Sequence, residues 1–413
     1  MFKKSQVVLI SILLFFFSTQ NINAVIDPLI VLNNKFGIHI LDETDIEDAA
    51  WLVNSSGGDW GYVTFVIRSD ERETTRWQKF FDILRKKRII PIVRIASRQL
   101  NEGWEKPSID EVDDWINFLN SLNWITQNRY VVIGNEPNHK KEWGGEINPE
   151  EYAFYLKTFS EKLKRVNEDF FVMPAGFDAS APNGNGSISE SEYLKRMLQS
   201  EPEIFNQIDG WASHSYPNPD FSGSEFGQGR GSVNTFLWEL DLLKNLGVEK
   251  KLPVFITETG WAHNKNEEIN GYFEPDEISQ KIKTAFQESW NNENVVAVTP
   301  FVLNYKEPPF DIFSWKDASG NYYDFFFAVK DIPKVQGQPK QINSGHILGL
   351  ILPQIFKKAD IFYGVAYIKN TGQVIWEKGT KTFINKNGGR LLIEPVYPDI
   401  IYPGHSALVY LFR

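Results

Sequence analysis

The residues with the clearest capacity for chemistry are two glutamates, each placed where a short apolar run ends. Glu136 comes directly after the run at residues 130–134 and one asparagine, and Glu258 follows the run at residues 253–257. Such runs, ended by glycine, proline or asparagine, are typical of buried strands that lead into loops, and loops on a rigid scaffold often carry function. Two carboxyl groups held at one site could perform acid and base catalysis on a sugar.

Eight strand-like runs alternate with helix-like segments along the chain, which is the pattern expected if a barrel positions these glutamates. The strands are predicted at residues 35–40, 62–68, 89–96, 130–134, 171–176, 210–216, 253–257 and 295–302. Amphipathic stretches between them, at residues 75–87, 109–122 and 149–166 for example, carry apolar residues at helical spacing. We therefore predict an α/β fold, a (β/α)8 TIM barrel, with Glu136 ending strand four and Glu258 ending strand seven at the C-terminal rim.

The two ends of the chain differ in character from the predicted barrel. Residues 1–24 combine two lysines, an apolar stretch and a terminal alanine, as signal peptides do, and the stretch is shorter than the roughly 20 residues that span a bilayer. We predict a catalytic barrel at 25–332, a linker at 333–345 and a small C-terminal β-sandwich domain at 346–413, where β-rich runs alternate with turn residues. The protein is expected to be secreted, extracellular or periplasmic, and membrane-anchored only if the leader is not cleaved.

Composition excludes several classes of protein. The chain has no cysteine, which excludes disulfides and thiol nucleophiles, and its formal net charge of −10 disfavours nucleic acid or an anionic membrane as partner. The six histidines are scattered and fit no zinc motif, and no calcium loop or phosphate-binding glycine loop occurs. We therefore expect no metal and no cofactor, and a neutral glycan as partner because an acidic glycan would be repelled.

Three motifs occur in order along the chain and together resemble one large group of enzymes. They are Gly-Asn-Glu-Pro at 134–137, His-Ser-Tyr at 214–216 and Thr-Glu-Thr-Gly-Trp at 257–261. This combination resembles the retaining TIM-barrel glycoside hydrolases of clan A over about residues 35–330. Within the clan the motifs are similar to those of families 5, 17 and 39, and they do not single out one family.

The resemblance implies a role for each motif residue. Glu136 would be the acid/base, Asn135 would bond the 2-hydroxyl of the sugar and Glu258 would be the nucleophile. His214 and Tyr216 would flank the nucleophile, and they lie on the same face of a strand because they are two residues apart.

Further residues are expected around this centre. His39 ends strand one, and it is either a rim residue or a buried histidine bonded to backbone. Arg68 and Arg94 are expected as charged groups at the rim, with salt bridges in the barrel mouth as the alternative. Family 5 enzymes usually carry a histidine late on strand three, where this chain offers Arg94 and Arg98. Trp261 is expected to stack on a sugar, and the tryptophan that follows strand eight in family 5 corresponds at best to Trp315.

These observations predict a secreted retaining β-glycosidase that hydrolyses O-glycosidic bonds of a neutral polysaccharide or oligosaccharide. Two alternatives remain open at this stage: a transglycosylase that uses the same covalent intermediate, and a barrel that binds glycans without cutting them. Carboxyl groups about 5 Å apart would indicate retention, whereas a gap of about 6.5 to 9.5 Å would admit a water and give inversion.

Overall fold

The structure is a computed structural model that describes most of the chain after the expected signal peptide. The described residues are 25–263, 272–351, 363–377, 379, 381–384 and 390–412. The expected signal peptide at residues 1–24 lies outside them. None of the helices in these ranges has the length and apolar character needed to cross a membrane.

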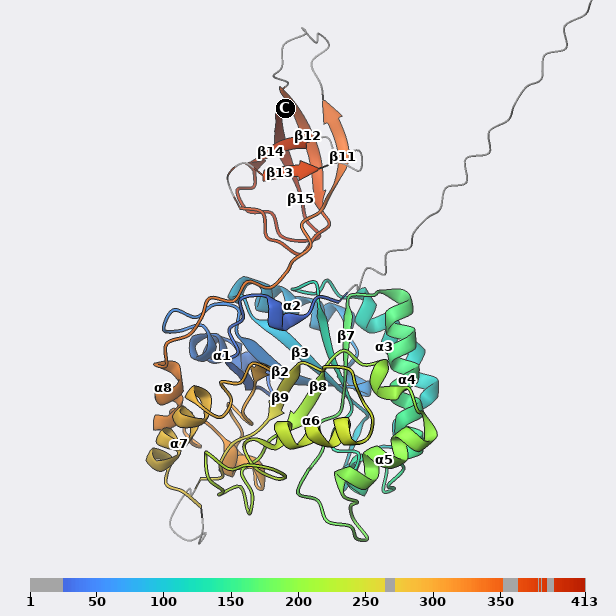
Figure 1. The fold of residues 1–413 in the computed structure, drawn as a ribbon. Coiled ribbons are helices and arrows are strands. Elements are labelled where there is room, and N and C mark those ends of the chain that lie inside the picture. The colour runs from blue at the N-terminus through green and yellow to red at the C-terminus, as the bar shows by residue number, and fades with distance from the viewer. Residues whose placement is uncertain are drawn as a thin grey trace, which may run out of the picture.

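Within the described part of the chain, eight parallel strands form two sheets that meet at both edges. Figure 1 shows these strands in the interior of the domain with the helices outside them. The strand orders are β1-β2-β3-β6-β7 and β10-β9-β8, and single parallel bridges join Phe36 to Val298 and Asp178 to His214. All eight strands predicted from the sequence are present. Their bounds are β1 (Gly37–His39), β2 (Tyr62–Arg68), β3 (Ile90–Ala96), β6 (Arg129–Ile133), β7 (Phe170–Pro174), β8 (Trp211–His214), β9 (Val254–Glu258) and β10 (Val295–Val298).

Each of these strands is followed by one α-helix in the described residues, as the alternating sequence pattern predicts. Helix α4 begins after Asn148, whose side chain accepts a hydrogen bond from Glu151 N, and a proline occupies its first turn. The helices are α1 (Ile46–Val53), α2 (Thr74–Lys87), α3 (Val112–Ser121), α4 (Pro149–Val166), α5 (Glu190–Ser200), α6 (Thr235–Asn245), α7 (Pro275–Gln287) and α8 (Asp324–Lys330).

Short elements occupy several of the connections. A two-stranded hairpin, β4 (Gln99–Leu100) with β5 (Gly103–Trp104), follows β3. The 3-10 helices are η1 (Pro28–Ile30), η2 (Glu43–Asp45), η3 (Ser69–Glu71), η4 (Ile109–Glu111), η5 (Lys140–Glu142), η6 (Ile204–Asn206) and η7 (Phe310–Phe313). Because β4, β5, η5 and η7 all follow the C-terminal ends of parallel strands, they lie at the end of the fold where such proteins place their chemistry.

The parallel strands bury both faces. One face packs on the helices, where Phe65 of β2 stacks on Trp77 of α2 with ring centroids 5.5 Å apart. The other face turns toward the space between the strands, which is filled by a separate cluster that includes Tyr130, Phe171 and Phe255. Tyr130 lies 5.0 Å from Phe171 and 5.1 Å from Phe255 between ring centroids. Strands that are covered on both faces explain the nearly continuous apolar runs in the sequence.

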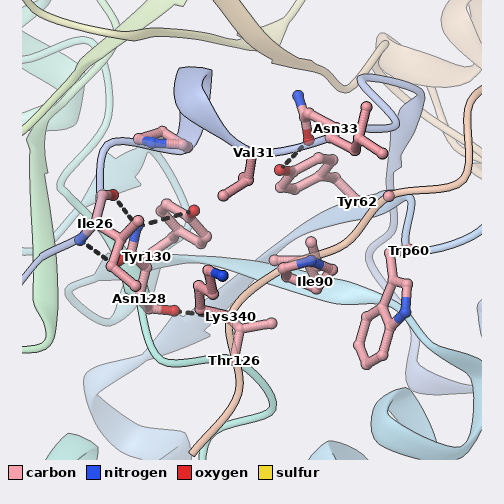
Figure 2. A pocket seen from close by; sticks show the side chains of 14 residues that line it. Ile26, Val31, Asn33, Trp60, Tyr62, Ile90, Thr126, Asn128, Tyr130 and Lys340 are labelled. Carbon is pink, nitrogen blue, oxygen red and sulfur yellow. Dashed lines mark hydrogen bonds between the residues drawn. The ribbon is translucent and has the colours of Figure 1, made fainter.

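Two chain segments cover the N-terminal end of the strands, residues 26–33 from the beginning of the described chain and residues 337–340 from the segment after α8 (Figure 2). Tyr62 donates its hydroxyl to Asn33 Oδ1 at 2.6 Å, and Asn128 Nδ2 donates to Ile26 O at 2.7 Å. The remaining cavity, of about 20 Å³, is large enough for about one water molecule. This cavity therefore has no room for a larger ligand.

The segment expected as a linker, residues 333–345, is bound along the domain that contains the parallel strands. Lys334 N donates to Ser56 O at 3.1 Å, and Gly337 N donates to Asp59 O at 2.9 Å. The ammonium group of Lys334 also donates to carbonyl groups at the C-terminal end of α8, including that of Val329 at 2.9 Å. This segment is therefore a strap that leads the chain across the N-terminal end of the strands.

The C-terminal residues form one antiparallel sheet in the described ranges, with strand order β11-β12-β15-β14-β13. The expected β-sandwich would need a second sheet in this part of the chain, and the described residues after 345 form a single sheet, so the sandwich is not confirmed. The sheet is attached at the N-terminal end of the parallel strands, because Gln373 Nε2 donates to Thr126 O at 2.7 Å and Arg85 Nε donates to Gln373 O at 3.1 Å. Its strands are β11 (Gly345–Ile351), β12 (Tyr363–Asn370), β13 (Lys381–Ile384), β14 (Arg390–Tyr397) and β15 (Ser406–Phe412).

Candidate active site

The chain turns sharply after β6 and thereby presents Glu136. Gly134 has a φ of 89°, which glycine adopts freely, and Glu136 itself has a φ of 32°, which is rare for a residue with a side chain. The backbone N–H of Glu136 donates to Gly176 O at 3.0 Å, which ties the turn to the end of β7. Strained backbone of this kind is concentrated at functional sites, and here it accompanies a side chain that reaches His214 of β8.

The two glutamates predicted from the sequence face each other. One carboxylate oxygen of Glu136, one ring nitrogen of His214 and one carboxylate oxygen of Glu258 all lie within 4.8 Å of one another. His214 Nδ1 is 2.9 Å from Glu136 Oε1 and 3.9 Å from Glu258 Oε2, so the imidazole lies between the carboxyl groups. Tyr216 donates its hydroxyl to Glu258 Oε2 at 3.1 Å.

Arg94 of β3 links the second oxygen of Glu258 to Asn135. Its Nη1 contacts Glu258 Oε1, and the same nitrogen donates to Asn135 Oδ1 at 2.7 Å. Both pairs are largely shielded from water, since Arg94 and Glu258 are 7% and 8% exposed. The structure therefore brings together six of the residues singled out from the sequence: Asn135, Glu136, His214, Tyr216, Glu258 and Arg94.

The electrostatic environment favours the ionised form of Glu258. Burial alone would raise its pKa, but the charges of His214 and Arg94 outweigh burial and lower the pKa of Glu258 to about 2. Burial opposes the charged form of His214 as well, yet the charge of Glu258 and the hydrogen bond to Glu136 raise the pKa of His214 above its usual value. Burial raises the pKa of Tyr216, which keeps its hydroxyl a hydrogen-bond donor.

Two local features aim His214 at the carboxyl groups. The pairing of β8 with β9 shifts register between Ser213 and His214, which places His214 opposite Glu258, and a shift of this kind re-aims a side chain. The ring then packs against the backbone of Gly176, where an added Cβ would lie only 2.2 Å from His214 Cδ2. Position 176 therefore requires glycine.

A cleft with a volume of about 560 Å³ opens over these residues. One wall consists of aromatic side chains from the loop after β10, including Phe301, Tyr305 and Phe310. Trp104 of β5 and Arg68 of β2 line other parts of the cleft. Arg68 forms an ion pair with Glu71, with 2.9 Å between Nη2 and Oε1. The cleft thus combines aromatic surfaces with a charged floor, which is the composition expected of a ligand site.

Three predicted site residues lie elsewhere. Trp261 donates its indole N–H to Gly223 O at 2.8 Å and packs near Trp290 in the core, and Trp315 packs against Phe325. Both indoles are 3% exposed or less, so stacking on a sugar does not fit their positions. His39 is fully buried and does not line the cleft; burial, together with the charge of Arg94, lowers its pKa to about 3, so it is neutral.

The sequence did not single out three further groups in the cleft. Glu142 of η5 accepts a hydrogen bond from Asn135 Nδ2 at 3.1 Å, and His139 Nε2 lies 2.8 Å from Asp178 Oδ2. Burial and the charge of Glu136 raise the pKa of Glu142 to about 7. The available signal was weak, because Glu142 and His139 follow Glu136 in an ordinary polar loop, and only the path of that loop brings them back to the cleft.

The cluster of Glu136, His214 and Glu258 also has the donor types of a metal site. Two observations disfavour a cation there. The guanidinium group of Arg94 already contacts Glu258, and the raised pKa of His214 favours a proton on the ring. The arrangement suits proton transfer and nucleophilic attack better than metal binding.

Solved structures of glycoside hydrolases share this fold. A monomeric beta-xylosidase from Caulobacter crescentus CB15 superposes with a TM-score of 0.50 at 14% identity, covering 82% of this chain and 74% of that one. A family 39 glycoside hydrolase from Bacteroides cellulosilyticus WH2 superposes with a TM-score of 0.50 at 15% identity, covering 94% and 82%. No protein-family model and no curated protein sequence matches the chain. The chain therefore shares its fold with these glycoside hydrolases, which agrees with the resemblance carried by the three motifs.

Proposed function

We propose that the protein is a retaining β-glycosidase in which Glu258 is the nucleophile and Glu136 the acid/base. The observation that carries this proposal is the short separation of the two carboxyl groups. One oxygen of Glu136 lies within 4.8 Å of one oxygen of Glu258. Carboxyl groups roughly 5 Å apart leave no room for a water between nucleophile and sugar, whereas inversion needs about 6.5 to 9.5 Å. The depressed pKa of Glu258 supports the assignment, because a nucleophile must be ionised.

The proposed reaction is a double displacement. The ionised Glu258 attacks the anomeric carbon as Glu136 gives its proton to the leaving oxygen, which forms a glycosyl-enzyme ester and releases the first product. Glu136, now a carboxylate, takes a proton from water as the water attacks the anomeric carbon, and the ester bond breaks to return Glu258 as a carboxylate. Tyr216 and Arg94 hold the Glu258 oxygens in position, and Asn135 would bond the 2-hydroxyl of the sugar.

The cleft supports a neutral oligosaccharide or polysaccharide as substrate. Its volume of about 560 Å³ lies within the usual range for ligand sites, and aromatic rings such as Phe310, Tyr305 and Trp104 can pack on the apolar faces of pyranoses. Because one structural neighbour is a beta-xylosidase, β-xylosides are the first substrates to test.

Export and domain organisation form part of the same proposal. Residues 1–24 would direct secretion to the extracellular space or periplasm, residues 25–332 would form a closed (β/α)8 catalytic barrel, and the sheet within residues 346–413 would be an accessory domain. The edge bridges Phe36–Val298 and Asp178–His214 support closure of the barrel. A leader that is not cleaved would leave the enzyme anchored to the membrane.

The proposal is tested by assaying the mature chain on aryl β-glycosides and β-glycans beside Glu136→Gln and Glu258→Gln. Both variants should lose nearly all activity, whereas Glu146→Gln should not, because Glu146 is an exposed carboxylate of the same loop as Glu136 and is paired with Lys106. Azide added to Glu258→Ala should restore turnover and give a glycosyl azide of inverted configuration.

Three outcomes would change the proposal. Inverted product from the unaltered protein would exclude the covalent intermediate. A predominance of products lengthened by an added sugar acceptor would identify a transglycosylase. Glycan binding without turnover on any substrate would favour a non-catalytic glycan-binding barrel.

A further inference from the structure

A third carboxyl group, that of Glu142, lines the cleft beside the two glutamates of the proposed reaction. The loop that carries it is firmly held. Glu142 N donates to His139 O at 3.0 Å, and the next residue, Trp143, is buried and donates its indole N–H to Glu151 Oε2 at 3.0 Å. The Trp143 ring also packs edge-on against Tyr152 of α4 at 5.4 Å. The loop therefore presents the Glu142 carboxyl group in a fixed position.

Glu142 and Arg94 hold the side-chain amide of Asn135 from both ends. Arg94 Nη1 donates to Asn135 Oδ1 at 2.7 Å, and Asn135 Nδ2 donates to Glu142 Oε2 at 3.1 Å. A guanidinium group can only donate and an ionised carboxylate can only accept. A flip of the amide would place donor against donor and acceptor against acceptor, so the two partners select one orientation.

In the selected orientation one N–H of Asn135 remains available. Under the proposed function, this N–H binds the 2-hydroxyl of the sugar. Asn135 and Glu258 also share Arg94 as a hydrogen-bond partner in this site. The orientation of Asn135 therefore determines whether a donor or an acceptor meets the substrate.

The charge on Glu142 affects how strongly it holds Asn135. The charged groups that act on Glu142 are Glu136, Lys141 and Arg94. Burial and the Glu136 charge raise the pKa of Glu142 to about 7, so the carboxyl group ionises as pH rises through neutrality. A charged acceptor makes a shorter and stronger hydrogen bond than a neutral one.

We propose that Glu142 is a positioning residue that orients Asn135 for the 2-hydroxyl of the substrate, and that its ionisation strengthens this hold. The 2-hydroxyl part rests on the proposed function. Glu142 acts through Asn135 and takes no part in bond breaking, so its removal should affect only substrates that carry the 2-hydroxyl.

The kinetic test compares an activated aryl β-glycoside with its 2-deoxy analogue. Glu142→Ala should lower kcat/KM for the parent glycoside about tenfold, the value of one lost hydrogen bond, and should leave the 2-deoxy substrate nearly unchanged. Glu142→Gln, which keeps an acceptor oxygen, should recover most of this loss. Glu146→Gln, an exposed carboxylate of the same loop, is the matched control.

The quantity to follow with pH is the ratio of kcat/KM for the parent glycoside to kcat/KM for the 2-deoxy substrate. Both substrates depend equally on the reacting glutamates, so this ratio isolates the effect of Glu142. In the unaltered protein the preference for the parent glycoside should rise as pH increases through about 7, and in Glu142→Gln it should be flat. An equal loss on both substrates in Glu142→Ala, or a ratio that still titrates near neutrality in Glu142→Gln, would overturn the proposal.

A measurement without turnover keeps this inference separate from the proposed function. The side-chain amide resonances of Asn135, assigned by their loss in Asn135→Asp, should shift with a midpoint near pH 7 in the unaltered protein and should lose this step in Glu142→Gln. If no glycan is cleaved but this titration is seen, the proposed function fails and the positioning of Asn135 stands. If glycans are cleaved and the amide does not respond to Glu142, only the positioning role fails.

Discussion

Replacing Gly176 by alanine should disable the site through one steric clash. A Cβ atom there would lie 2.2 Å from His214 Cδ2, whereas ordinary contacts begin at about 3.4 Å. The imidazole must therefore retreat by about 1 Å (3.4 − 2.2 = 1.2 Å), which the 2.9 Å contact with Glu136 cannot accommodate. Overpacking of this kind costs about 1–3 kcal/mol of stability, and a misplacement of ~1 Å at an active site costs on the order of 10²-fold in rate.

The assay measures kcat/KM and the thermal unfolding midpoint for Gly176→Ala beside Gly184→Ala. Gly184 lies in the loop after β7, and a Cβ atom there would meet nothing within 4 Å, so it controls for the change from glycine to alanine. We expect Gly176→Ala to lose both activity and stability and Gly184→Ala to keep both. Unchanged stability and activity in Gly176→Ala would refute the packing argument, and lower stability with full activity would show that the position of His214 does not limit the reaction.

Three further predictions follow from charge and burial. Burial raises the pKa of Glu239 from 4.5 to about 7, so its contribution to stability is complete below pH 4.5 and is lost as pH rises through 7. The free energy of unfolding in urea should therefore rise for Glu239→Gln, relative to the unaltered protein, by up to about 3 kcal/mol between pH 4 and 8. Arg94→Gln removes a charge that lowers the pKa of Glu258, and the acid limb of kcat/KM should move up by about 1–3 pH units. Trp104→Ala should raise KM with little loss of stability, whereas Trp261→Ala should lose about 3–5 kcal/mol of stability.

Each of these predictions has a control and an outcome that contradicts it. Asp241→Asn, an exposed carboxylate on the same helix as Glu239, should show no such pH dependence, and a flat difference for Glu239→Gln would mean that the buried carboxyl group is ionised in the folded state. An acid limb that stays in place in Arg94→Gln would leave His214 as the main stabiliser of the nucleophile. Similar changes in KM for Trp104→Ala and Trp261→Ala would contradict the placement of the cleft.

The sequence was sufficient to predict the centre of the site because strand ends are strong local signals. Glu136 and Glu258 each end an apolar run, and parallel strands bring their C-terminal ends to one side of the fold. His214 and Tyr216 were predicted on one strand face from their spacing of two residues, and both reach the carboxyl groups. The two glutamates needed only periodicity and strand order, whereas the expected roles of His214 and Tyr216 came from the resemblance of their motif to known glycoside hydrolases.

Which other residues line the cleft depends on the path of each loop after its strand, and local sequence patterns do not encode that path. Trp261 was favoured because it is close to Glu258 in sequence, but its ring turns into the core and binds Gly223 O. Glu142 was missed for the opposite reason, since it contacts Asn135 only because η5 brings the loop back toward β6. The expected sandwich is not confirmed by the described residues, which form one sheet at this end of the chain, and alternating β-rich runs fix neither the number of sheets nor their order.

Arg94 gives this site a property that a histidine at the same place would not supply. The residue binds both Glu258 and Asn135, and arginine keeps its charge at any pH the protein meets. The charge of Arg94 acts with that of His214 to lower the pKa of Glu258, so the guanidinium group still favours the ionised form of Glu258 when His214 is neutral. A histidine would lose its charge in the same pH range as Glu142. Arg94 therefore favours ionisation of Glu258, the proposed nucleophile, across the pH range near neutrality in which the hold of Glu142 on Asn135 should change.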